Sequence, residues 1–176
     1  MRTRRLLLTA ASLVVAASLL GACGSSGGDA VQTKTSPTKT SPAKGCRTAA
    51  KAKAQTKAPK VDPPSKAVTG IHKVDGIVGC GAVVKATSTV TVQYILKSKS
   101  SGQVVDSSWS RNEPFDVTLG QGQVISGWDQ GIPGMRVGGE RTLTLGPDAG
   151  YGPQGSPPAI AANDTLVFVM DLQKIG

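Results

Sequence analysis

The sequence predicts an α+β domain in which an antiparallel β-sheet wraps around one short helix. Two observations carry this prediction. Several segments alternate apolar and polar residues, a pattern typical of half-buried strands, and only one short segment between them has helical character. Several strands and a single helix that share one core form an α+β arrangement. We therefore expect a single sheet whose concave side holds the helix.

Most of the expected strands lie in the second half of the chain. They are residues 87–96, 115–119, 140–145 and 164–172. The polar segment 98–102 is rich in turn-forming residues and predicts a hairpin loop. His72, the only histidine, lies among Val, Ile and Lys on an expected edge strand, where neither a metal ligand nor a catalytic base is indicated.

The expected helix covers residues 126–132 and ends at Pro133-Gly134. Glycines are frequent in and around it, which indicates tight turns and a close approach of the backbone to its neighbours.

The basic charge of the chain is confined to its N-terminal part. Residues 1–66 hold twelve Lys or Arg and two Asp, whereas residues 67–176 hold eight basic and nine acidic residues. A nucleic-acid-binding protein needs a basic face on a folded module, so we expect no nucleic-acid partner. A basic tail attracted to anionic lipid or to a cell-wall polymer fits better.

The first residues are typical of an export signal. Three arginines among the first five residues precede an apolar run over 6–20, which is shorter than the roughly 20 residues a membrane span needs. The following Leu20-Gly21-Ala22-Cys23 resembles the lipobox of bacterial lipoproteins. That resemblance implies a signal peptide over 1–22, lipidation of Cys23 and a lipid anchor at the extracytoplasmic face of the cell membrane. An ordinary signal peptide next to an unrelated Cys, and an uncleaved single-span anchor, are the alternatives.

The segment that follows has little apolar surface. Residues 24–66 contain no aromatic residue, repeat Lys-Thr-Ser-Pro over 34–42, and alternate Lys with Ala up to Lys60. Such a composition buries too little apolar surface to offset the entropy of ordering. We predict a disordered tether over 23–66 and a folded domain over 67–176.

Cys46 and Cys80 are the two cysteines left once Cys23 carries lipid. An even pair in an oxidising compartment makes a disulfide between them plausible. Two thiols and one histidine are too few for a metal site, and neither Cys lies in a catalytic pattern with His or Asp.

Linked motifs from residue 104 onward resemble the FKBP-type peptidyl-prolyl cis-trans isomerases. They read Val-Val-Asp-Ser-Ser at 104–108, Pro-Phe at 114–115, Leu-Gly-Gln-Gly-Gln-Val-Ile-Ser-Gly-Trp-Asp-Gln-Gly at 119–131, Met-Arg-Val-Gly-Gly-Glu-Arg at 135–141, Pro-Asp-Ala-Gly-Tyr-Gly at 147–152 and Thr-Leu-Val-Phe at 165–168. The resemblance covers roughly 68–176. It implies an FKBP-like antiparallel sheet of five to six strands around one short helix. We expect a monomer without cofactor or metal.

The resemblance also implies an apolar cup for proline. Trp128 would form the floor, and the Ile125 N–H, the Tyr151 hydroxyl and the Asp106 carboxylate would supply polar contacts. The walls would be Tyr94, Phe115, Val124, Ile125, Tyr151, Ile160 and Phe168. The implied substrates are X-Pro bonds of exported proteins, and the implied ligands include the macrolides tacrolimus and rapamycin.

Rotation about an X-Pro bond breaks no covalent bond, so the absence of a nucleophile and a metal agrees with this activity. Several positions differ from the family. Val105 replaces a usual Phe, Leu96 a usual Gly, and Ala159 a usual larger apolar residue. Val105 and Ala159 favour an alternative function, a proline-segment binding module or chaperone with weak or no turnover. A structural envelope protein is the third hypothesis.

Overall fold

The structure, a computed structural model, describes residues 45–176. The expected signal peptide over 1–22, the lipidation site Cys23 and the first part of the expected tether lie outside the described residues. None of the helices within 45–176 is long and apolar enough to cross a membrane.

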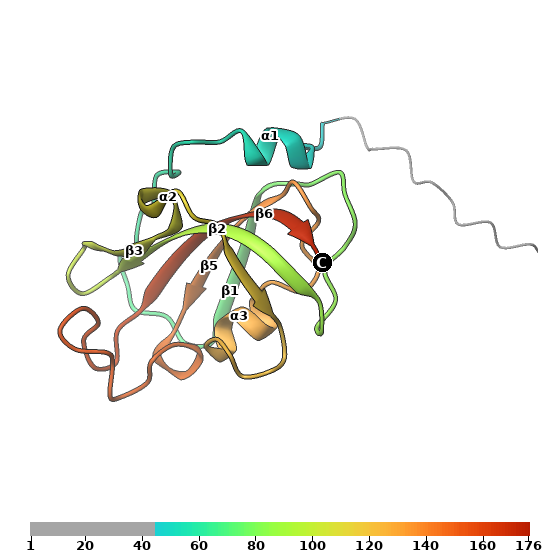
Figure 1. Cartoon of the computed structure of the whole chain (residues 1–176). Helices are drawn as coiled ribbons and strands as arrows, with labels where there is room; N and C mark the ends of the chain where they lie inside the picture. Colours follow the sequence, from blue (N-terminus) through green and yellow to red (C-terminus); the bar gives the residue numbers. More distant parts are fainter. Residues whose placement is uncertain (1–44) are drawn as a thin grey trace, which may run out of the picture. The chain divides into compact units, whose positions relative to one another are not determined.

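The described residues form one antiparallel sheet of six strands (Figure 1). The strands are β1 (Ile71–Ile77), β2 (Thr89–Ser98), β3 (Val104–Ser107), β4 (Phe115–Thr118), β5 (Glu140–Leu145) and β6 (Leu166–Ile175). Their order is β1-β5-β6-β2-β3, and β4 pairs with the first half of β2, so that β3 and β4 share one edge of that long strand. The predicted α+β class, with five to six antiparallel strands, is confirmed.

The central strand β6 is buried on both of its faces. Leu166, Phe168, Met170 and Leu172 belong to the main apolar cluster on the concave side, and the alternating Val167 and Val169 belong to a second cluster on the convex side. Side chains of a strand alternate between faces, so a strand that is apolar at nearly every position needs cover on both sides. Each side of this sheet is accordingly covered by different elements.

Helix α3 (Ser126–Gly131) covers the concave side and coincides with the predicted helix at 126–132. Two glycines of this helix face β5. A Cβ atom at Gly127 would lie 2.4 Å from Leu145 Cδ1 and 2.8 Å from the Ala149 carbonyl oxygen, and one at Gly131 would lie 2.6 Å from Leu143 Cδ1. The glycines therefore let the helix approach the sheet closely enough to place Trp128 against it.

Replacing Gly127 by alanine is expected to destabilise the domain by about 1–3 kcal/mol, the usual effect of overpacking a core. The higher helix propensity of alanine, worth about 1 kcal/mol, does not compensate, because the Ala149 backbone carbonyl cannot rotate away as a leucine methyl can. Urea denaturation measures the effect. Gln130→Ala, on the exposed side of α3, is the control, and equal stability of the two variants would show that the close contact is not required.

The convex side is covered by residues 45–66, called here the N-terminal strap. This segment contains helix α1 (Ala49–Lys53), which packs on β6 on the side of the sheet opposite α3 (Figure 1). Ala52 is fully buried and Val61 packs into the second apolar cluster. The predicted boundary between tether and domain at residue 66 is therefore wrong for the described residues, since the strap is part of the folded domain.

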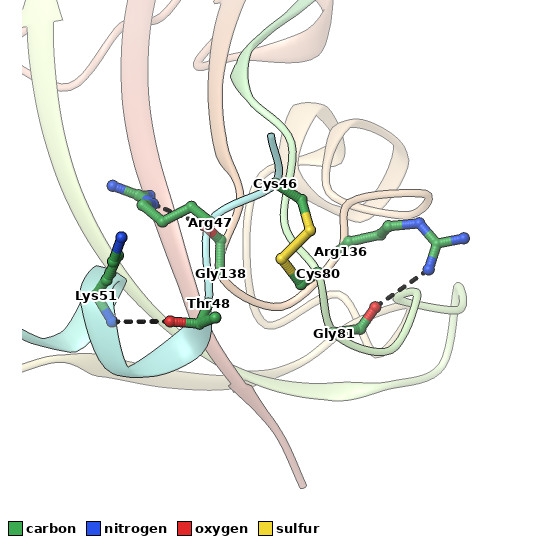
Figure 2. Close-up of a disulfide and its surroundings, with 8 residues drawn as sticks. All are labelled: Cys46, Arg47, Thr48, Lys51, Cys80, Gly81, Arg136 and Gly138. Atoms are coloured by element: carbon green, nitrogen blue, oxygen red, sulfur yellow. Dashed lines mark hydrogen bonds between the residues drawn. A yellow bond between two sulfur atoms is a disulfide. The ribbon is translucent and has the colours of Figure 1, made fainter. Parts of the chain in front are cut away.

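Three kinds of interaction hold the strap in place. A disulfide joins Cys46 to Cys80, the pairing expected from the sequence, and Arg47 Nε donates to the Gly138 carbonyl at 2.7 Å (Figure 2). The Arg47 guanidinium also forms an ion pair with Asp171 of β6, whose side chain has no solvent exposure. Further along, the Trp109 indole N–H donates to the carbonyl oxygen of Gln55 at 3.2 Å.

Two further short helical segments are not predicted by the sequence patterns. They are α2 (Ser108–Arg111) and a 3-10 turn, η1 (Pro147–Ala149). The Ser107 side chain accepts a hydrogen bond from the Ser110 N–H and caps α2. Segments of three or four residues are too short to show an apolar period, which explains why the sequence does not predict them.

Candidate functional site

A cavity beside α3 has a volume of about 430 Å³ and lies on the concave side of the sheet. It is lined mostly by apolar side chains from β2, β4, β6, α3 and the adjoining loops. The lining residues are Tyr94, Leu96, Asp106, Phe115, Gln123, Val124, Ile125, Trp128, Tyr151 and Phe168. A concave apolar site of this size with a few polar groups is typical of a small-ligand or peptide-side-chain pocket.

Four aromatic rings form the inside of this cavity, with Trp128 at their centre. The centroid of the Trp128 ring lies 5.2 Å from the ring centroid of Tyr94, 5.4 Å from that of Phe168 and 5.9 Å from that of Phe115. In each pair the two rings are nearly perpendicular. Such edge-to-face pairs are the favoured aromatic arrangement. Trp128 itself is only 4% exposed, whereas Phe115 is 37% exposed and lies at the opening. The rings thus form a fixed apolar box that is open at one side.

A charged group lies at the rim of the box. The Tyr94 hydroxyl donates to the Asp106 carboxylate, and the Arg111 guanidinium forms an ion pair with the same carboxylate. Arg111 also donates to the Tyr94 oxygen at 3.2 Å. Burial raises the pKa of Asp106, but the hydrogen bonds from Tyr94 and Arg111 outweigh burial and lower its pKa below the ordinary value. Burial, together with the hydrogen bond to Asp106, raises the pKa of Tyr94. At neutral pH, Asp106 is therefore an ionised carboxylate and Tyr94 a neutral phenol.

Replacing Arg111 by methionine is expected to raise the pKa of Asp106, because a cation and a hydrogen bond that stabilise the carboxylate are lost. The depressed pKa of Asp106 contributes stability above the ordinary carboxyl pKa, and this contribution is lost as pH falls through the lower folded value. An NMR titration of the Asp106 carboxyl carbon measures the shift directly. Arg136→Met removes an exposed arginine elsewhere and is the control, and an unchanged Asp106 midpoint in the Arg111 variant would contradict this account.

Two further polar groups lie at the cavity. Ile125 precedes the first turn of α3, and its backbone N–H donates a hydrogen bond to no acceptor within residues 45–176. The first N–H groups of a helix have no partner in the helix itself, so this donor can serve a ligand. Tyr151 follows η1, lines the cavity and is 39% exposed.

The structure brings together eight of the nine pocket residues expected from the sequence. The exception is Ile160, which is buried in the main apolar cluster and does not line the cavity. Val105 and Ala159, two of the positions that differ from the family, also do not line it, and Val105 packs against the apolar cluster instead. Leu96 and Gln123 line the cavity without having been expected there. The alternation of β2 places Leu96 on the same face as Tyr94 and was the signal that could have found it.

Residues 45–176 contain no group of three or more His, Cys, Asp or Glu side chains suited to a metal ion. The cavity likewise presents no Ser or Cys beside a base. The arrangement can bind an apolar ring between aromatic faces and hold a flanking backbone by hydrogen bonds.

Comparisons with known proteins agree with this geometry. The family model described as FKBP-type peptidyl-prolyl cis-trans isomerase matches residues 80–173. An FK506-binding protein of Streptomyces anulatus is 47% identical over 95 residues, which are 53% of this chain and 77% of that protein. The 39 kDa FK506-binding nuclear protein of Drosophila melanogaster is 41% identical over 112 residues, which are 64% of this chain and only 31% of the relative.

A solved structure shows the same fold. The crystal structure of AtFKBP13 superposes with a TM-score of 0.56 at 32% sequence identity, covering 60% of this chain and 93% of that one. The family match extends over more than half of the chain and includes most of the cavity. From its sheet, its aromatic cavity and these matches, the chain belongs to the family of FKBP-type peptidyl-prolyl cis-trans isomerases.

Proposed function

We propose that the chain is a peptidyl-prolyl cis-trans isomerase that binds the proline ring in the aromatic box. The observation that carries the proposal is the box itself, with Trp128 at its floor and Tyr94, Phe115 and Phe168 around it. A proline ring is apolar, compact and rigid, and it fills such a box without exposing a polar group to it.

The reaction needs no chemical group that the cavity lacks. Rotation about the amide faces a barrier of roughly 18–20 kcal/mol because it disrupts the resonance of the planar bond. The twisted amide is less dipolar than either planar form, so a dry apolar site suits it better than water does. Selective stabilisation of about 1.4 kcal/mol raises the rate about tenfold.

The polar groups of the cavity hold the peptide on either side of the rotating bond. The Ile125 N–H donates to a substrate carbonyl, and the Tyr151 hydroxyl supplies a second donor at the opening. The ionised Asp106, held by Tyr94 and Arg111, provides a fixed negative charge at the rim. One side of the bond is thereby fixed while the other turns.

The substrates that we propose are X-Pro bonds of exported proteins, with the chain anchored through Cys23 at the extracytoplasmic face of the cell membrane. The lipobox-like Leu20-Gly21-Ala22-Cys23 supports this location. The Cys46–Cys80 disulfide supports it independently, because disulfides persist in oxidising compartments. Labelling with a radioactive fatty acid tests the anchor, and a Cys23→Ala chain that still carries label would contradict it.

We also propose that macrolides of the tacrolimus and rapamycin type occupy the same cavity. Both relatives bear names that state binding to FK506, which is tacrolimus. Leu96 offers additional apolar surface beside the box, and Phe115 exposes part of its ring at the opening. Such a ligand competes with proline peptides for one site.

A protease-coupled assay on a proline peptide tests the activity. The chain is expected to shorten the slow phase, which takes tens to hundreds of seconds without a catalyst, in proportion to its concentration. A slow phase no faster than in buffer, with peptide binding retained, would favour the second candidate function. That candidate is a proline-segment binding module, and the Leu96 side chain, where the family usually has glycine, is the observation that favours it.

A further inference from the structure

The N-terminal strap carries most of the uncompensated charge of the described residues. It contains six basic residues and one acidic residue, whereas residues 67–176 contain eight basic and nine acidic residues. Arg47 is neutralised by Asp171, and Lys60 pairs with Asp62 at 3.1 Å. The exposed Lys51, Lys53 and Lys57, within and just after α1, form no ion pair with any partner inside 45–176, and neither does Lys66 at the end of the strap.

These lysines lie on the side of the sheet away from the cavity. α1 packs on β6 with Ala52 buried beneath it, which leaves Lys51 and Lys53 pointing to solvent on the convex side. α3 and the aromatic box lie on the opposite, concave side (Figure 1). The sheet therefore separates the basic strap from the side of the domain that holds the aromatic box.

The distance along the chain from the expected anchor to this surface is short. Only 21 residues, 24–44, separate Cys23 from Gly45. A chain of that length that behaves as a coil has a root-mean-square reach of roughly 25 Å. The Cys46–Cys80 disulfide fixes the domain end of this connection at the strap itself (Figure 2).

We propose that the strap is a membrane-docking surface that rests on anionic lipid and turns the aromatic box away from the bilayer. The proposal rests on the lipid anchor of the proposed function. The anchor keeps the domain near the membrane, and the attraction of the strap lysines to anionic lipid determines which face of the domain is turned toward the bilayer. The open side of the box is then accessible to chains that emerge from the membrane or diffuse in the envelope.

Charge complementarity sets the size of the effect. A lysine close to an anionic surface favours the bound state about fivefold, so three unpaired lysines together favour this orientation on the order of a hundredfold. The attraction is screened within about 8 Å at physiological ionic strength and within about 3 Å at 1 M salt. The preferred orientation should therefore vanish in 1 M salt and on vesicles without net charge.

The two tryptophans of the chain report the orientation, because they lie on opposite sides of the sheet. Trp109 is in the convex cluster and bonds the strap at Gln55, and Trp128 is the floor of the concave cavity. The full chain is extracted in detergent from a bacterial expression host and reconstituted into phosphatidylglycerol vesicles that contain a dansyl-labelled lipid. Energy transfer is then compared between the Trp109→Phe and Trp128→Phe variants, with circular dichroism as the check of folding.

The proposal expects stronger transfer from Trp109 than from Trp128, and loss of that difference in the triple variant Lys51→Gln, Lys53→Gln and Lys57→Gln. The matched control removes the same charge elsewhere, at Lys73, Lys85 and Lys99, and should keep the difference. Equal transfer from both tryptophans, or a difference that survives 1 M salt, would overturn the docking surface while leaving the anchor intact.

Failure of the proposed function gives a different result. A chain that does not sediment with the vesicles at all would refute the anchor and the docking surface together. Loss of isomerase activity on a soluble peptide, measured in parallel, would refute the enzyme without affecting the orientation.

Discussion

The chain with Arg47 replaced by methionine is expected to be about 3–5 kcal/mol less stable than the wild type, the usual result of removing one partner of a buried ion pair. The Asp171 carboxylate is fully buried on the convex side of β6, and Arg47 supplies its only ion-pair partner within residues 45–176. Urea denaturation of the two proteins measures the difference. Lys51→Met, an exposed change in the same strap, is the control and should alter stability little.

The pH dependence of this effect identifies its cause. Burial raises the pKa of Asp171, and the hydrogen bond and charge of Arg47 oppose that rise, so removing Arg47 should raise the pKa further. A carboxyl group with a raised folded pKa favours the folded state below its ordinary pKa, and that contribution is lost as pH rises through the folded value. The deficit of the Arg47 variant should therefore be largest at neutral pH and shrink on acidification.

Glu140 also titrates in this region. Its pKa is raised by burial and by the charge of Asp171, so it too becomes protonated as pH falls. Asp171→Asn removes the negative charge of the pair. In that background, Arg47→Met should lower the free energy of unfolding by less than half as much as it does in the wild type. An equal cost in both backgrounds, or a deficit constant between pH 7 and pH 4, would show that Arg47 acts through packing alone.

Replacing Trp128 by leucine is expected to lower kcat/KM for proline isomerisation about tenfold or more. The variant loses edge-to-face contacts with Tyr94, Phe115 and Phe168, each worth about 0.5–1.5 kcal/mol, and leaves the floor of the box too low to contact the proline ring. About 1.4 kcal/mol of lost transition-state stabilisation corresponds to tenfold in rate. The protease-coupled assay with a proline peptide measures the change.

Trp109→Leu provides the matched control for this experiment. It also removes a buried tryptophan, but from the convex cluster beneath the strap. It should reduce stability and leave kcat/KM of the folded protein unchanged. If both leucine variants lowered kcat/KM equally, the effect would be one of general stability and Trp128 would not be the floor of the site.

The parts of the fold that the sequence predicted are those whose cause is local. Alternation of apolar and polar residues marked β2, β4 and β5, a long run of β-forming residues marked β6, and the glycine-rich segment ending at Pro133 marked α3. The strap was missed because its Lys/Ala composition is that of a solvated tether. Its folding depends on partners far away in sequence, such as Asp171, which is 124 residues from Arg47, and Trp109, which is 54 residues from Gln55.

The same distinction holds for the site. Residues in contiguous motifs, such as Val124, Ile125 and Trp128, line one cavity because one short helix and its preceding loop carry them. Ile160 was misplaced because its loop folds back on itself, with Ser156 and Ile160 bridged, so that the side chain enters the core. No sequence pattern describes such a turn in advance.

Exchange spectroscopy by NMR on a proline peptide tests the central claim, catalysis in the aromatic box, most directly. At equilibrium, a small amount of the chain is expected to produce exchange cross-peaks between the cis and trans forms, growing in proportion to protein concentration. Tacrolimus that shifts the Trp128 indole resonance should abolish them. Exchange at the rate of buffer alone, while the peptide still shifts the Trp128 resonance, would contradict catalysis and leave a pocket that only binds.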